Sequence, residues 1–139
     1  MAPSGTQSAS PIPRLIHLSL MVTPVAFAAV VWFVIRTRPM PPAGNPVVHF
    51  ALVGVALMAM IAGALMALRI EPRKAGQSDA SYWQATLPRA IMIWGLFEAG
   101  ALLATIAGLL SAVMLYPLLG TMAFLGLMIG FTPGRLAGG

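Results

Sequence analysis

Very few side chains in this sequence could do chemistry. Its 139 residues include three acids, two histidines and no cysteine. The lack of cysteine excludes a thiolate nucleophile, a disulfide and a Cys-ligated metal or cluster. Asp79 is the only aspartate and both histidines lie near the starts of apolar segments, so no Ser/His/Asp arrangement is credible. No glycine-rich stretch has the spacing of a phosphate-binding loop. We therefore expect no catalytic residues, no metal site and no cofactor, and we expect that the chain is not an enzyme.

Glu98 is the strongest candidate for a functional side chain. It lies nine residues after Arg89 within an apolar stretch, about 14 Å along a helix and near the middle of a roughly 30 Å hydrocarbon layer. A charge at that depth costs on the order of 3 kcal/mol, so a buried carboxyl there usually stays protonated and can hold or pass a proton. Trp94 and Thr105 share its helix face and complete a candidate ion, proton or interhelical site.

A structural role for Glu98 is equally open. A protonated carboxyl would donate a hydrogen bond across a helix bundle to Thr23, to Ser19 or to a backbone carbonyl freed beside Pro24. Pro24 falls in the middle of the first apolar segment, where its missing N–H and its ring predict a kink. The residues do not decide between structural and ion-handling roles.

His17 and His49 invite comparison with haem or chlorophyll ligands. They lie near the starts of two successive apolar segments, which would run in opposite directions and place the imidazoles about 30 Å apart. One iron within a single chain cannot bind both of them. A single axial ligand within a dimer or larger complex stays possible, although an interfacial histidine is the commoner case.

The composition indicates the elements that must position these residues. Hydrophobic residues make up 59% of the chain and charged residues 8%, against roughly 25% charged in a soluble domain. Lipid must therefore be the solvent for most of the chain. We predict an all-α, polytopic membrane protein built as a bundle of four transmembrane helices. The expected parts are a disordered arm at 1–14, a transmembrane domain at 15–131 with spans at about 15–35, 47–68, 90–107 and 113–131, and a short tail at 132–139.

The segments between the spans carry turn and interface signals. Residues 36–46 contain four prolines and form a short connection. Residues 69–88 form the main polar loop, in which residues 81–84 (SYWQ) fit a capping box and predict a short interfacial helix before Pro88. A signal peptide ending at Ala28 is the alternative for the first segment, but the apolar run continues for seven more residues.

The distribution of basic residues predicts the topology. With four spans, six of the eight basic residues lie on one side, together with both termini. These six are Arg14, Arg69, Arg73, Lys74, Arg89 and Arg135. The positive-inside rule then places both termini in the cytoplasm and leaves Arg36 and Arg38 on the other side. Scattered singly at span ends, these residues suit anionic lipid headgroups rather than nucleic acid.

Small residues recur at four-residue spacing in three of the expected helices, a pattern typical of close helix packing or oligomerisation. The predicted packing positions are Gly63, Gly100, Gly108, Gly126 and Gly130.

Residues 88–104 (PRAIMIWGLFEAGALLA) resemble the third helix of a family of small uncharacterised bacterial membrane proteins with four helices. Leu96, Glu98 and Pro133 match that family's pattern, whereas Ile93 stands where its members have a basic residue. The resemblance implies four spans in a bacterial inner membrane and implies no activity.

Residues 95–99 (GLFEA) are also similar to the carboxylate helix of the proteolipid subunit of rotary ATP synthases. That family's partner helix is a dense glycine repeat, whereas residues 47–68 have glycine only at 54 and 63. We interpret this similarity as convergence on what a carboxyl in mid-membrane requires.

Two functions follow as hypotheses. The first is a small structural or accessory membrane protein within a homo-oligomer or a larger membrane complex, with no catalysis of its own. The second is a small transporter, or a subunit that translocates ions or protons, and uses Glu98.

Overall fold

A computed structural model describes residues 11–38, 41–43 and 45–138. The described chain is all-α, as the composition predicts, while most of the arm expected at 1–14 lies outside the described residues. The helices are α1 (Ile12–Thr37), α2 (Pro46–Ala67), α3 (Asp79–Ser111), α4 (Leu115–Gly130) and α5 (Pro133–Leu136).

Three of these helices, α1, α2 and α3, are long and apolar enough to cross a membrane, and α4 is a shorter apolar helix of 16 residues. Their outer surfaces match a lipid environment. Large apolar side chains such as Phe33, Met58 and Met122 are each more than 60% exposed. Exposed apolar area on this scale is unusual for a soluble monomer. The structure therefore agrees with a small multi-pass membrane protein.

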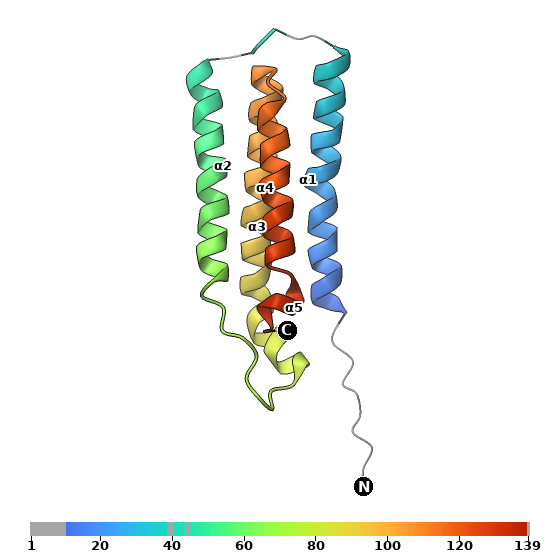
Figure 1. Cartoon of the computed structure of the whole chain (residues 1–139), viewed down its shortest axis with the longest axis vertical. Coiled ribbons are helices and arrows are strands. Elements are labelled where there is room, and N and C mark those ends of the chain that lie inside the picture. Colours follow the sequence, from blue (N-terminus) through green and yellow to red (C-terminus); the bar gives the residue numbers. More distant parts are fainter. Residues whose placement is uncertain (1–10, 39–40, 44, 139) are drawn as a thin grey trace.

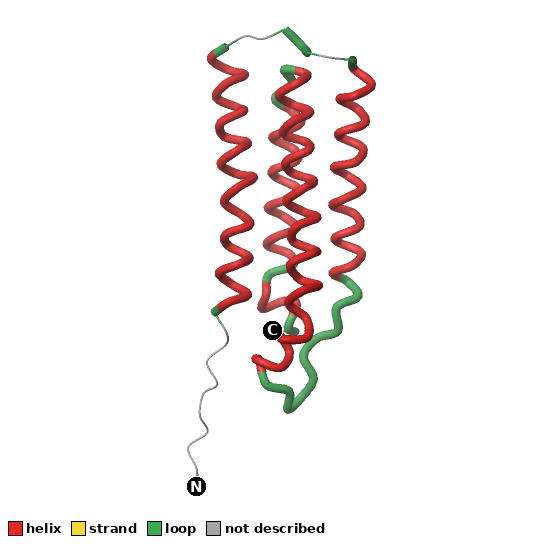
Figure 2. Tube along the Cα trace, turned by 180° about the vertical axis from the view of Figure 1, so that it is seen from behind, coloured by secondary structure: helices red, strands yellow, loops and turns green. Residues whose placement is uncertain are grey.

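The bundle is organised around α3. Figures 1 and 2 show α3 and α4 side by side, with α1 and α2 flanking them on opposite sides. Half of the apolar window of α3 is buried within the chain, against 11% of that of α1. The largest fully buried side chains include Trp94, Phe97 and Phe124, from α3 and α4. The interior is thus centred on α3, which packs against α4 and against α2, and which α1 covers on the other side.

The third helix begins earlier than its apolar residues indicate. It starts at Asp79 rather than near residue 90, and it includes the segment predicted to be a separate interfacial helix. Its N-cap is Ser78, whose side chain accepts a hydrogen bond from Ser81 N at 3.2 Å. Pro88 lies inside the helix on its exposed side. The missing proline N–H leaves only the carbonyl one turn earlier, at exposed Gln84, without its helical donor, and water can serve that carbonyl near the end of the bundle.

The first helix also begins before its predicted boundary. It starts at Ile12, so the last part of the expected arm is helical, with Pro13 in the first turn, where a missing N–H costs nothing. The second helix begins at Pro46 with Asn45 as N-cap, and Asn45 Oδ1 accepts a hydrogen bond from Val47 N at 2.9 Å. Pro24 is buried inside α1, which is helical on both sides of it; the kink stays a prediction.

The turn between α3 and α4 lies slightly later than its expected position. Gly108 is still helical, α3 ends at Ser111, and Ala112 adopts the left-handed conformation with φ 55°. Its N–H bonds back to the carbonyls of Gly108 and Leu109, so the last turn of α3 closes on itself. The fourth helix runs from Leu115 to Gly130, within the predicted span of about 113–131.

Candidate functional site

Glu98 lies on the boundary between the buried face of α3 and its outer flank. Its side chain is partly buried, whereas Ile91, two turns earlier on the same stripe, is 40% exposed. Within the described part of the chain, the Glu98 carboxyl has no hydrogen bond and no ion pair. Nine residues after Arg89, it lies deep within the apolar part of the helix. The described part of the chain therefore leaves the carboxyl without a partner at this depth.

The partners expected around Glu98 make other contacts. Thr105 is fully buried and donates to the carbonyl of its own helix one turn back, at Ala101, over 2.8 Å. Ser19 likewise donates to Leu15 O in α1, over 2.8 Å, and Thr23 is exposed. In the described structure these residues therefore form no hydrogen-bonded cluster with the carboxyl.

Trp94 and His17 instead secure the end of α4. His17 Nε2 lies 3.0 Å from the Met128 carbonyl oxygen, and Trp94 Nε1 donates to the Phe131 carbonyl oxygen over 3.0 Å. The two rings also meet edge to face, with centroids 5.0 Å apart. The last carbonyls of a helix have no partner within it, and in lipid each unpaired group is costly. Side chains from α1 and α3 therefore cap a helix that ends before the polar end of the bundle.

His49 also has a backbone partner. Its Nε2 lies 2.7 Å from the Ala43 carbonyl oxygen, at the start of α2. His17 and His49 are at opposite ends of the bundle, because α1 and α2 run in opposite directions (Figure 1). Among the described residues, no group of three His, Asp or Glu side chains could hold a metal ion.

The small residues divide into packed and open positions. A Cβ added at Gly63 would lie 2.7 Å from Phe97 Cε1, and one at Gly100 would lie 2.6 Å from Met60 Cγ. Gly108 meets the ring of Pro117 at the α3–α4 turn. Gly126 and Gly130, predicted to be packing positions, have open space beside them within this chain. Gly120, which the four-residue pattern did not include, packs against Ala104.

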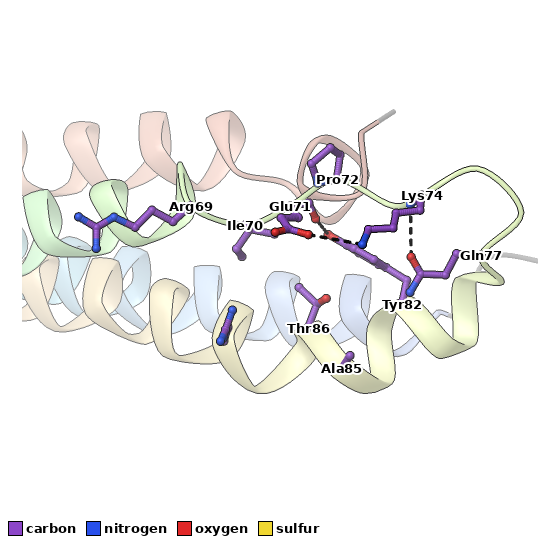
Figure 3. Close-up of a pocket in the computed structure, with 10 residues that line it drawn as sticks. Arg69, Ile70, Glu71, Pro72, Lys74, Gln77, Tyr82, Ala85 and Thr86 are labelled. Atoms are coloured by element: carbon purple, nitrogen blue, oxygen red, sulfur yellow. Dashed lines mark hydrogen bonds and ion pairs between the residues drawn. The ribbon is translucent and has the colours of Figure 1, made fainter.

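A polar hollow of about 600 Å³ lies at the end of the bundle that carries the α2–α3 loop (Figure 3). We call it the basic hollow. Figure 3 shows loop side chains facing those of the first turns of α3 across it. Its charged and hydrogen-bonding lining includes Arg69, Glu71 and Lys74 from the loop and Tyr82, Thr86 and Arg89 from α3.

Tyr82 fixes the walls of the basic hollow. Its hydroxyl donates to the Leu136 carbonyl oxygen over 2.6 Å and lies 3.3 Å from that of Glu71. Arg73 N also donates to the Ala137 carbonyl oxygen over 3.2 Å. The segment after α4 therefore folds back under α3 and holds the α2–α3 loop in place. Burial raises the free-energy cost of leaving this hydroxyl without a partner, so these contacts stabilise the polar end.

Sequence reasoning did not group the residues of the basic hollow. The sequence indicates Arg69 and Arg89 only as topology signals and as separate partners for lipid headgroups, and Tyr82 only as part of the expected interfacial helix. The available signal was that both arginines adjoin the ends of apolar segments, which a helical hairpin brings together. Thr121, on α4, was also missed; its hydroxyl is buried without a hydrogen-bond partner in the described part of the structure.

Comparison with protein-family models, with curated proteins and with solved structures gives no match. The class of the protein therefore follows from its helices alone. It is a small, all-α, multi-pass membrane protein with three long apolar helices and a shorter one.

Proposed function

We propose that the chain is a structural or accessory membrane protein that acts within a homo-oligomer or a larger membrane complex, where Glu98 lies in the interface with a neighbouring subunit. It has no catalytic chemistry of its own. The observation that carries this proposal is the Glu98 carboxyl, which is deep in an apolar helix, partly exposed on its flank and without a partner among the described residues. A polar group in lipid is stabilised by a hydrogen bond from an adjacent helix.

The proposed topology has four spans with both termini in the cytoplasm of a bacterial inner membrane. Both described chain ends and the α2–α3 loop lie at one end of the bundle (Figure 2). That end carries six of the eight basic residues, which supports a cytoplasmic location by the positive-inside rule. At 16 residues, α4 is about 24 Å long, and the side-chain caps from α1 and α3 compensate for its shortness. Reporter fusions at the carboxyl terminus test the orientation.

The second candidate is a transporter in which Glu98 holds a proton or a cation. The same carboxyl favours it, since ionisable groups in membrane helices commonly serve ion or proton pathways. The hollows at the basic end, between α1 and α4, and between α2 and α4 are lined by other residues. A transporter would need a pathway that reaches Glu98, and these hollows do not include it; the accessory role needs only a neighbouring helix beside the carboxyl.

Two substitutions at Glu98 separate the candidates. Glu98→Leu removes the polar group, and the accessory role predicts a chain that still inserts but no longer assembles, seen as a smaller particle in mild detergent. Glu98→Gln keeps a hydrogen-bonding amide and removes the titrating proton, so assembly should largely persist. The matched control is Glu71→Gln in the exposed loop, which should change neither assembly nor insertion.

Reconstituted vesicles provide the opposing result. A pH-dependent flux that Glu98→Gln abolishes, while assembly is retained, would overturn the accessory role in favour of the transporter. Normal assembly of Glu98→Leu would contradict the proposed interface.

A further inference from the structure

The described side chains that line the basic hollow carry an excess of positive charge. Arg69, Lys74 and Arg89 line it with a single acid, Glu71. Lys74 Nζ lies 3.9 Å from Glu71 Oε2 in an exposed pair, which contributes little. The two arginine side chains have neither an ion pair nor a hydrogen bond within the described residues. Two arginines from different elements therefore line the same hollow and have charge available for an anion.

A second hollow of about 280 Å³ continues from the first toward the membrane interior. It shares Arg69, Ile70 and Arg89 with the basic hollow and is otherwise lined by Met66 and Ile93. Met66 lies in the last turn of α2, three residues before Arg69, and Ile93 follows Arg89 by one turn along α3. Both steps lead from the polar end into the apolar part of the bundle. The two hollows together have a cationic part at the polar end of the bundle and an apolar part toward the membrane interior.

We propose that these adjoining hollows form a binding site for an anionic phospholipid. Arg69 and Arg89 hold the phosphate of its headgroup, and part of one acyl chain lies against Met66, Ile70 and Ile93. This occupant fits because the two arginines adjoin the ends of the apolar parts of α2 and α3, the level at which lipid phosphates lie. A soluble phosphate ester would use the cationic part and leave the apolar part empty. The inference depends only on membrane insertion of α2 and α3, and not on the role of Glu98.

The test measures lipid binding by the full-length protein in a neutral detergent. Dioleoyl phosphatidylglycerol is titrated and bound lipid is counted by native mass spectrometry, with dioleoyl phosphatidylcholine as the neutral probe. A basic residue near anionic lipid contributes about a factor of five in affinity. We therefore expect the double variant Arg69→Gln/Arg89→Gln to bind phosphatidylglycerol about 30-fold more weakly. The double variant Arg69→Lys/Arg89→Lys, which keeps both charges, should retain most of the binding.

The matched control is Arg36→Gln/Arg38→Gln, which removes the same charge from the opposite end of the bundle. It should leave phosphatidylglycerol binding unchanged. Because neither Arg69 nor Arg89 has a partner among the described side chains, the glutamine variant should unfold at the same detergent concentration as the unmodified chain. If that variant fails to fold, the preference of the unmodified chain and of the lysine variant for phosphatidylglycerol over phosphatidylcholine is the deciding measurement.

Three results of the lipid titrations would overturn the proposal. They are equal binding of phosphatidylcholine and phosphatidylglycerol, an equal loss of binding in the control variant, and full binding by a folded Arg69→Gln/Arg89→Gln protein. Glycerol phosphate and inorganic phosphate distinguish the source of the anion. Displacement of the lipid by either one at the lipid's own concentration would assign the site to a soluble phosphate ligand instead.

Discussion

Polar side chains on the buried face of α3 have hydrogen-bond partners within the chain, whereas the acid on its outer flank has none among the described residues. On the buried face, Trp94, Thr105 and Ser111 each donate a hydrogen bond to a backbone carbonyl oxygen, over 3.0, 2.8 and 2.7 Å. On the flank, Glu98 has no partner within the described chain. Lipid supplies no hydrogen bonds, so each of these groups needs a protein partner. The buried groups are therefore part of the fold, and the flanking carboxyl is the one that another molecule can complete.

The largest expected effect comes from Trp94, which both fills the interior and caps α4. Trp94→Ala removes a fully buried indole and leaves the Phe131 carbonyl without its donor. We expect a loss of about 3–5 kcal/mol in the free energy of unfolding. The measurement is unfolding of the protein in mixed micelles by increasing mole fractions of a denaturing detergent. Trp32→Ala, at a tryptophan 46% exposed on α1, is the control and should have a much smaller effect. Equal losses in the free energy of unfolding for the two variants would contradict the distinction between the buried interior and the exposed flank.

The next test compares two glycines of α3. Gly100→Val places side-chain atoms against Met60 and against the backbone carbonyl oxygen of Ala56, which a Cβ would approach to 2.8 Å. A backbone atom cannot move aside as a flexible side chain can, so we expect a loss of about 1–3 kcal/mol. Gly95→Val, at a position with nothing within 4 Å, should cost far less in the same detergent titration. A stable Gly100→Val protein would contradict the close α2–α3 packing.

The apolar segments gave good predictions of the helices because segment length and charge directly reflect the hydrocarbon layer. The start of α3 was missed, since Pro88 and the polar residues before it are typical of a loop. Ser78, not the predicted box at 81–84, caps the helix. Packing at Gly63 and Gly100 agreed with the small-residue pattern, whereas Gly126 has open space beside it, because a repeat does not tell which face meets a neighbour.

The polar end was harder to predict because its contacts join residues far apart in the sequence. The hydrogen bond from Tyr82 to Leu136 spans 54 positions, and no local pattern indicates it. The acceptor is a backbone carbonyl oxygen, which every residue has, so the residue type at position 136 does not indicate the bond. The basic hollow likewise depends on how the α2–α3 loop returns to α3. Glu98 itself could be selected from the sequence, but its lack of a partner is a property of the fold.

Tyr82 offers a smaller test at the polar end. Tyr82→Phe keeps the ring and removes the hydroxyl that bonds to Leu136 O. We expect a loss of about 1 kcal/mol and faster amide exchange in residues 134–138, because this contact holds α5 under α3. Tyr116→Phe is the matched control, as the Tyr116 hydroxyl has no hydrogen bond among the residues described. Unchanged exchange in Tyr82→Phe would show that α5 is held by other contacts.

The smallest expected effect is at Glu98, and it is the sharpest test of the contrast between the two sides of α3. In the isolated monomer, Glu98→Gln removes no intrachain hydrogen bond, so the free energy of unfolding should change by less than about 0.5 kcal/mol. Trp94→Phe, one turn away on the buried face, removes a donor and leaves a carbonyl unpaired, which should cost about 1–3 kcal/mol. Unfolding of both variants is measured by detergent titration at protein concentrations low enough to keep the chain monomeric.

A Glu98→Gln loss as large as that of Trp94→Phe would mean that the carboxyl is already bound within its own chain, and the case for an external partner would fail. A negligible loss in the monomer, together with weaker assembly of Glu98→Leu, would locate the contribution of the carboxyl between subunits, because only there would its removal matter.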